Sequence, residues 1–402
     1  MNILTEPALP RSREFLAIST LALGAFAMAM NANVLAPLMP FLAEDPIYRG
    51  MAAEELAAAF GLLGVSAGVA GAIAAFALGP VIDRIGRRVP MIAGIVIFFF
   101  ASLGHLIVDS HGGLLTARAL AGFGSGLAFT SCSAAVADLV PYARRGAAMG
   151  VFSAGLFLAI PVGLPLSTLL ARNGQWRMVF VIQAGVGLLA LLGFATLIPA
   201  SLGRSDRRDS WWRTMVDVLR RPMVLPALLS VMLHTGAFAV TVQFSGKWLD
   251  DDGILPKSDH ISLWVILGLT SALGSLILPR LSDRLGKRNF VLATGAGAAI
   301  LLLLLGRVND VQGLLLVGIP LTIVAAARSG PFQALMSEFV DERMRGTLMG
   351  IRAAFINLGI GGFFGIGGLV YGANGFQSLL YVAAISMVVS YFLVRLFVRE
   401  PR

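Results

Sequence analysis

Twelve long apolar stretches follow one another along this chain, and they constrain its fold more than any other feature of the sequence. Each approaches or exceeds the roughly 20 residues that an α-helix needs to cross about 30 Å of hydrocarbon. Hydrophobic residues make up 57% of the chain and charged residues only 13%, which is too little polar surface to cover a soluble globule. The sequence therefore predicts an all-α integral membrane protein with twelve transmembrane helices. The stretches lie near residues 15–41, 58–81, 89–108, 112–137, 146–170, 176–199, 223–248, 260–281, 289–307, 312–337, 347–371 and 376–397.

The remaining charges are unequally distributed between the connections. Arginines and lysines gather in the even-numbered connections and the C-terminal tail, whereas acidic residues such as Asp250–Asp252 mark the opposite connections. Cytoplasmic loops of membrane proteins carry an excess of Lys and Arg, so we expect a multi-pass inner-membrane protein with both termini in the cytoplasm. Because the arginines flank membrane spans, the net charge of +9 indicates contact with the lipid bilayer and not with nucleic acid.

The chain repeats itself at an offset of 200 residues. Residues 137–151 align without a gap to residues 337–351, and Asp83-Arg84 recurs as Asp283-Arg284. A repeat of this length predicts two pseudo-symmetric halves of six helices each, as in many transporters. We assign residues 1–199 to the N-terminal half, 200–222 to a basic cytoplasmic linker and 223–402 to the C-terminal half.

A stripe of polar and aromatic residues follows one face of the seventh predicted helix. The repeat places Asn33 of the first helix at a depth similar to that of His234, in the opposite half. Polar side chains within a span are costly unless they line a cavity, so we expect these residues to line a substrate cavity. Histidine titrates near neutral pH, which makes His234 the proton-coupling candidate. The alternative is a neutral histidine hydrogen-bonded to a neighbouring helix. The stripe consists of Ser230, His234, Phe238, Thr241 and Ser245.

Arg328 lies deep within the tenth predicted helix, where the repeat aligns it with Ala128. An arginine at that depth costs at least about 2.5 kcal/mol on insertion scales, so something must compensate its charge. One interpretation is an anionic ligand group or a gating role, since the guanidinium forks around carboxylates. The other is structural pairing with backbone carbonyls.

Several motifs resemble those of the major facilitator superfamily, and in general pattern the chain is most similar to its bacterial drug and metabolite transporters. The stretch from Gly79 to Arg88 resembles the family's loop signature between helices two and three, with a second copy starting at Pro279. Residues 115–124 resemble the fourth-helix signature, and residues 174–180 resemble the entry to helix six. The resemblance implies that Arg118 takes part in proton transfer or in packing of the N-terminal half, and we count it among the cavity residues.

The same resemblance implies a conformational latch at the cytoplasmic face. Asp83 would face the start of helix eleven, near Gly346–Arg352, only while the cytoplasmic ends of the two halves touch. A weaker partner would form around Asp283. The alternative is a topology anchor that merely keeps the loop inside, and the two roles are compatible. The expected latch residues are Gly79, Asp83, Arg84, Gly86, Arg87, Arg88, Asp283, Arg284, Gly286 and Arg352.

No enzymatic, phosphate-binding or metal-ligand motif occurs in the sequence, so we expect no enzyme, no cofactor and no metal. The prediction is a monomeric secondary active transporter of a small organic solute, working by alternating access and most simply by proton-coupled efflux of drug-like or metabolite compounds. One alternative is a transporter of a small organic anion with a cationic cavity. An alternative of another class is a transport-inactive membrane receptor.

Overall fold

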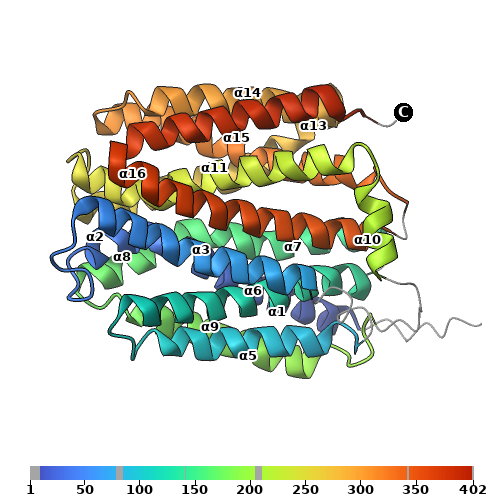
Figure 1. Cartoon of the computed structure of the whole chain (residues 1–402). Coiled ribbons are helices and arrows are strands. Elements are labelled where there is room, and N and C mark those ends of the chain that lie inside the picture. The colour runs from blue at the N-terminus through green and yellow to red at the C-terminus, as the bar shows by residue number, and fades with distance from the viewer. Residues whose placement is uncertain (1–9, 78–84, 141, 204–210, 342–343, 401–402) are drawn as a thin grey trace, which may run out of the picture.

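The protein, seen in a computed structural model, is a bundle of long helices that run side by side (Figure 1). The structure describes residues 10–77, 85–140, 142–203, 211–341 and 344–400, and no strand occurs within these ranges. Its elements are α1 (Arg11–Asn33), α2 (Leu35–Leu42), α3 (Ala53–Ala77), α5 (Arg88–Gly104), α6 (His111–Leu139), α7 (Tyr142–Leu158), η1 (Ala159–Gly163), α8 (Leu164–Arg172), α9 (Met178–Leu197), α10 (Trp211–Leu219), α11 (Val224–Asp251), η2 (Lys257–Asp259), α12 (His260–Ile277), α13 (Pro279–Leu285), α14 (Lys287–Leu305), α15 (Val311–Ser337) and α16 (Arg345–Phe397).

The helices account for twelve membrane crossings. In the described part of the chain, ten helical segments are long and apolar enough to span a bilayer, and α5 adds a shorter apolar helix of 17 residues. The 53 residues of α16 are two helices that meet at Gly375, where φ is 72°. Counting these two separately gives twelve crossings, as predicted, with helix ends a few residues from the expected positions.

Proline interrupts two of the spans in their middle. The first span breaks between α1 and α2 at Val34, because Pro37 has no N–H to donate to the carbonyl of Asn33. The fifth span is divided into α7 and α8 by the π-helical turn η1, which contains Pro161. Such turns relieve a helix that cannot complete its hydrogen-bond ladder.

We call α1 to α9 the N-terminal set and α11 to α16 the C-terminal set. The two sets meet through backbone, because glycines face each other across the contact. A Cβ atom added to Gly68 of α3 would lie 2.5 Å from Cα of Gly361 in α16, and one added to Gly268 of α12 would lie 2.5 Å from the nitrogen of Pro161. Small residues allow this close approach, as is common between membrane helices.

The two ends of the bundle are easily told apart (Figure 1). The helix α10 and the C-terminal end of α16 lie at one end, which we call the near end. The connections from α2 to α3 and from α11 to α12 lie at the other, the far end. At the far end α2 packs against α11, and Gly246 of α11 touches the carbonyl of Ala36, so the two sets are in contact there.

The sequence repeat is matched by repeated ion pairs. Nε of Arg87 lies 3.0 Å from Oδ2 of Asp138, and Nζ of Lys287 lies 2.6 Å from Oε1 of Glu338. All four residues obey the 200-residue offset. In both sets the pair ties the start of the third helix to the end of the fourth.

Backbone contacts repeat in the same way. Arg88 donates to the carbonyl of Ala195, and Arg288 donates to the carbonyl of Arg395 over 2.7 Å. Gly86 and Gly286 both have positive φ, at 88° and 82°, which only glycine adopts without strain. The two sets therefore share these local contacts, and the division at residues 1–199, 200–222 and 223–402 stays a prediction.

The contact between the sets yields a first prediction. Gly68→Ala should lower the free energy of unfolding by about 1–3 kcal/mol, because the added methyl group collides with the Gly361 backbone. Gly362→Ala is the matched control, since a Cβ there meets nothing within 4 Å. Thermal unfolding of the purified variants measures both, and equal midpoints would contradict the close backbone contact.

Candidate functional site

Arg328 of α15 is enclosed by protein and is 1% exposed. Its Nη2 donates to Oγ of Ser230 at 3.0 Å and to Oγ of Ser390 at 3.1 Å, and its Nη1 lies 3.2 Å from Nδ1 of His234. Because a guanidinium only donates, Nδ1 of His234 must accept this bond. The histidine is therefore neutral here and carries its hydrogen on Nε2.

The partners of Arg328 are themselves linked. The hydroxyls of Ser230 and Ser390 are 2.7 Å apart, and the Ser390 hydroxyl also donates to the Ser230 carbonyl at 3.0 Å. Nδ1 of His234 lies 3.1 Å from the sulfur of Met387. This polar cluster joins α11, α15 and the second helix of α16, all within the C-terminal set.

The N-terminal set contains a second buried arginine. Arg118 of α6 is 2% exposed, and its Nη1 donates to the carbonyl of Asn31 at 3.0 Å and to the side-chain oxygen of Asn31 at 2.6 Å. Asn31 lies one turn before the break between α1 and α2. The contact therefore fixes α6 to the first span beside its interruption.

Both arginines lack a carboxylate partner among the described residues: every side chain that hydrogen-bonds to Arg118 or Arg328 is neutral. A buried charge without a counter-charge leaves a positive potential in its surroundings, and a low dielectric strengthens it. The interior of the bundle is therefore cationic at two points, one in each set.

The predicted cavity residues separate into two groups. Ser230, His234 and Arg328 come together as the polar cluster just described. Thr241 donates to the carbonyl of Ala237, and Asn33 donates to the carbonyl of Ala29. Their hydrogen bonds therefore stay within their own helices.

The remaining cavity candidates do not meet at one point. Phe238 is half-buried and packs against the main apolar core. Arg118 contacts Asn31, not Asn33. A role of any of these residues toward a substrate stays a prediction.

Sequence reasoning missed Asn31, Met387 and Ser390. Each lies in a predicted span, and neither asparagine nor serine is rare enough in such helices to attract attention alone. Their importance becomes visible only in the structure, where α1 packs on α6 and where α11 and α15 pack on α16. The repeat offers no help, because Ser390 aligns with Ala190.

The latch residues are described in part. Gly79, Asp83 and Arg84 lie outside the described residues, as does the side chain of Asp283. Arg87 and Arg88 contact Asp138 and Ala195 within the N-terminal set, which fits the anchoring role.

Arg284, Gly286 and Arg352 are described members of the predicted latch, and none of them forms a hydrogen bond or ion pair with the described residues of the N-terminal set. The side chain of Arg284 is exposed, and Gly286 ends α13 with a positive φ. Arg352 is half-buried, and its Nε contacts no hydrogen-bond partner among the described residues. The latch itself stays a prediction.

A cationic contact joins the two sets at the far end. Nζ of Lys257 lies 2.5 Å from Oε1 of Glu44 and 3.2 Å from Oδ2 of Asp250, and it donates to the carbonyl of Pro40 at 3.2 Å. Pro40 belongs to the last turn of α2, and the C-terminal end of a helix attracts cations. One lysine of the C-terminal set thus holds the end of α2 and Glu44, two residues beyond it.

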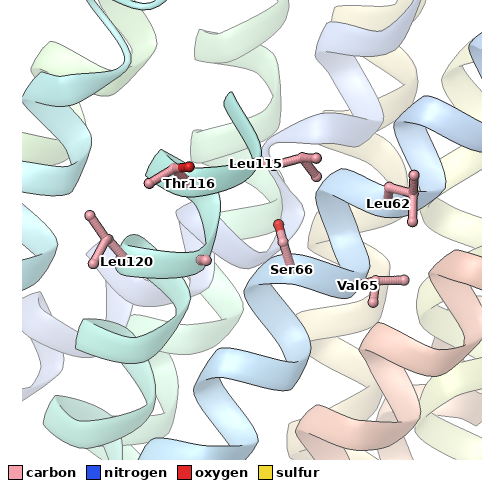
Figure 2. Close-up of a pocket in the computed structure, with 7 residues that line it drawn as sticks. Leu62, Val65, Ser66, Leu115, Thr116 and Leu120 are labelled. Carbon is pink, nitrogen blue, oxygen red and sulfur yellow. The ribbon is translucent and has the colours of Figure 1, made fainter. Parts of the chain in front are cut away.

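The outer face of the N-terminal set carries an apolar groove between α3 and α6 (Figure 2). It has a volume of about 440 Å³. Its two polar members, Ser66 and Thr116, donate to the carbonyls of Leu63 and Gly112 in their own helices. These two side chains therefore have no free hydrogen to donate to a solute, and their oxygens can only accept. Its lining consists of Leu62, Val65, Ser66, Leu115, Thr116, Ala119 and Leu120.

The polar cluster predicts that Arg328→Lys destabilises the protein by about 2 kcal/mol. A lysine cannot contact both serines and His234 in the geometry of a guanidinium fork, and hydrogen bonds to charged groups contribute about 1.5–3 kcal/mol. The thermal midpoint of unfolding measures the loss. Arg307→Lys is the control because Arg307 is exposed. Equal effects of the two substitutions would show that the cluster is not structural.

Comparison with curated proteins finds relatives along most of the chain. The uncharacterized MFS-type transporter YceJ of Bacillus subtilis is 26% identical over 373 residues, which cover 90% of this chain and 93% of the relative. The 3-(3-hydroxy-phenyl)propionate transporter of Escherichia coli is 27% identical over 324 residues, which cover 77% of this chain and 79% of the relative.

Solved structures share the fold. A D-xylose-proton symporter superposes with a TM-score of 0.77 at 19% identity, covering 96% of this chain and 98% of the symporter. The human organic anion transporter MFSD10 gives a TM-score of 0.74 at 18% identity, covering 95% and 99%. The family model of the Major Facilitator Superfamily matches residues 21–255 and 258–402. This chain is therefore a membrane transporter of the Major Facilitator Superfamily, built on that family's fold, and not an enzyme.

Proposed function

We propose that this protein moves a small organic solute across the inner membrane by alternating access, with both termini in the cytoplasm and one chain as the working unit. The observation that carries the proposal is the contact between the two sets. They meet through glycine backbone at Gly68 and Gly268, so side chains do not interlock at those two points. The far end is closed by Lys257 and Glu44.

The proposed cycle requires the far-end contact to break. Lys257 would release Glu44 and the carbonyl of Pro40 as the two sets separate at that end. Asp83 would then help to close the near end, as the family resemblance implies. Two latches at opposite ends that exclude each other make a central site accessible from one side at a time.

An organic anion is the substrate class that the charges favour. Arg118 and Arg328 are buried and have neutral partners only. At an effective dielectric of ~20, a unit charge attracts an anion ~10 Å away by about 1.7 kcal/mol. The arginines can therefore favour an anion through their field without touching it. The relative that transports 3-(3-hydroxy-phenyl)propionate acts on such a compound.

Proton-coupled efflux is the second candidate. One relative, from Mannheimia succiniciproducens, is described as a probable sugar efflux transporter and is 22% identical over 312 residues. The coupling role assigned to His234 meets an obstacle, because Arg328 occupies its Nδ1. Protonation there would bring two cations into contact, so His234 could take up a proton only after Arg328 moved away.

The anion proposal predicts a difference between two nearly isosteric compounds. We expect 3-phenylpropionate to raise the thermal midpoint of the detergent-purified protein, and its neutral amide, 3-phenylpropionamide, to raise it far less. A ligand at 100 times its Kd stabilises a protein by about 2.7 kcal/mol. In Arg328→Gln the carboxylate shift, measured from that variant's own midpoint, should shrink, whereas in Arg307→Gln it should not.

Equal shifts with the acid and the amide would contradict the anion proposal. A shift only with a lipophilic cation such as 3-phenylpropylammonium would favour the efflux of drug-like compounds instead. Proteoliposomes with an imposed pH gradient test coupling directly. A protein that binds a compound but moves none would be a receptor.

The far-end contact predicts that Lys257→Gln opens the far end. Spin labels at Glu55→Cys and Asp259→Cys, in a Cys132→Ser background, report the distance between the sets at that end. The ion pairs are partly exposed, so their loss should shift the conformational populations only a few-fold. We expect the longer-distance population to grow in Lys257→Gln and to stay unchanged in Lys287→Gln, whose ion pair lies within one set. An unchanged distribution in Lys257→Gln would exclude a latch at Lys257.

A further inference from the structure

Four polar side chains of the N-terminal set are enclosed, and each has at least one polar atom that forms no hydrogen bond with any described residue. Gln183 of α9 is fully buried, and both its Oε1 and its Nε2 are unpartnered. The same is true of Oγ of Ser102 and Nε2 of His105 on α5, and of Nε of Arg118 on α6. An unpaired polar group in a protein interior costs about 1–3 kcal/mol, so several of them in one region require an explanation.

The packing of α5 on α9 brings Ser102 and Gln183 to the same depth. Gly187 of α9 lies against the ring of Phe98 in α5, at 3.2 Å from an added Cβ. The rings of His105 and Phe180 stack with centroids 3.9 Å apart. The two helices are antiparallel. Ser102 follows Phe98 by four residues and Gln183 precedes Gly187 by four, so Ser102 and Gln183 lie opposite each other. The second contact gives the same register.

The packing of α5 on α6 adds Arg118. A Cβ on Gly124 of α6 would lie 2.6 Å from the carbonyl oxygen of Gly94 and 2.7 Å from the nitrogen of Phe98. Gly124 therefore lies opposite the turn of α5 between Gly94 and Phe98. Since the two helices are antiparallel, Ser102 of α5 and Arg118 of α6 lie at equal distances from this contact, toward the far end. The unpartnered atoms therefore lie at one depth, on α5 and on the two helices α6 and α9 that pack against it.

The unpartnered atoms include both donors and acceptors. Nδ1 of His105 lies 2.8 Å from the carbonyl of Ala101, and a carbonyl only accepts, so the neutral ring presents a bare lone pair at Nε2. Gln183 offers an acceptor at Oε1 and two donors at Nε2. Arg118 offers the donor Nε–H, and the hydroxyl of Ser102 can act in either way.

We propose that this site binds ordered water, which links Nε of Arg118 to Gln183, Ser102 and His105. The mixture of donors and acceptors selects the ligand. An anion would face the lone pairs of His105 and Gln183, and a cation would face the guanidinium. A small neutral molecule that donates and accepts satisfies every atom, and buried water typically makes about three such bonds. The site supports Arg118, which holds Asn31 beside the break in the first span. It does not depend on which solute the protein carries.

Hydroxyl-radical footprinting of the unmodified protein tests the proposal. Radicals generated by X-ray pulses from bound water oxidise the side chains that touch it. We expect His105 and Phe180 to be labelled several-fold more than Phe98, although His105 and Phe98 are both 0% exposed. Phe98 is a matched control because it lies on the same helix within an apolar cluster. Equal, background labelling of His105 and Phe98 would overturn the proposal.

The thermal stability of Gln183→Leu is a second test, because a dry site and a hydrated site predict changes of the midpoint in opposite directions. A dry site would become more stable when the unpaired amide is removed, so the thermal midpoint would rise. A hydrated site loses the partners of its water, so we expect the midpoint to fall and the labelling of His105 to disappear. A raised midpoint would contradict the proposal. If the variant fails to fold, the footprint of the unmodified protein decides alone.

Discussion

The rest of the structure depends on how closely the two sets of helices approach. At Gly68 and Gly361, and again at Gly268 and Pro161, backbone meets backbone and no side chain fits between. In a bilayer no hydrophobic effect drives helices together, so such van der Waals contact must supply the cohesion. At these two points the sets do not interlock, whereas one turn from Gly68 the Phe364 ring of α16 packs against Gly64 of α3. The π-helical turn at Pro161 lies at one of these points, so the least regular part of the fifth span touches the other set.

The contacts fall into a symmetric and an asymmetric class. The ion pairs Arg87–Asp138 and Lys287–Glu338 repeat at the same offset and join the same helices in each set, so they belong to the scaffold. The buried arginines do not repeat, because Arg328 aligns with Ala128 and its partners align with apolar residues. A duplicated scaffold with a buried arginine at a different position in each set places the specific chemistry of this chain in its asymmetric parts.

Much of this architecture could be predicted from the sequence. The length of the apolar stretches requires helices that cross a membrane, and the repeat around Asp83 and Asp283 predicts two sets. The depth of Arg328 indicated that its guanidinium needs partners within the bundle. Which groups hydrogen-bond to it could not be predicted, because the hydroxyl of Ser390 reaches Arg328 only through the packing of α16. The spacing of Ser230 and His234 shows that they share a face, but not that this face meets α15 and α16.

The most direct test of alternating access is a reversible lock at the far end. The pair Glu44→Cys and Lys257→Cys, in a Cys132→Ser background, replaces the contact in which Nζ of Lys257 lies 2.5 Å from Oε1 of Glu44. The two native side chains together reach farther than a direct disulfide, so a bifunctional methanethiosulfonate reagent would join the two cysteines. Proteoliposome transport of the compound that stabilises the protein most would be measured before cross-linking, after it and after reduction. The account predicts that the cross-link stops transport, that reduction restores it and that neither single cysteine responds. Undiminished transport by fully cross-linked protein would contradict a mechanism in which the far end opens between the two sets.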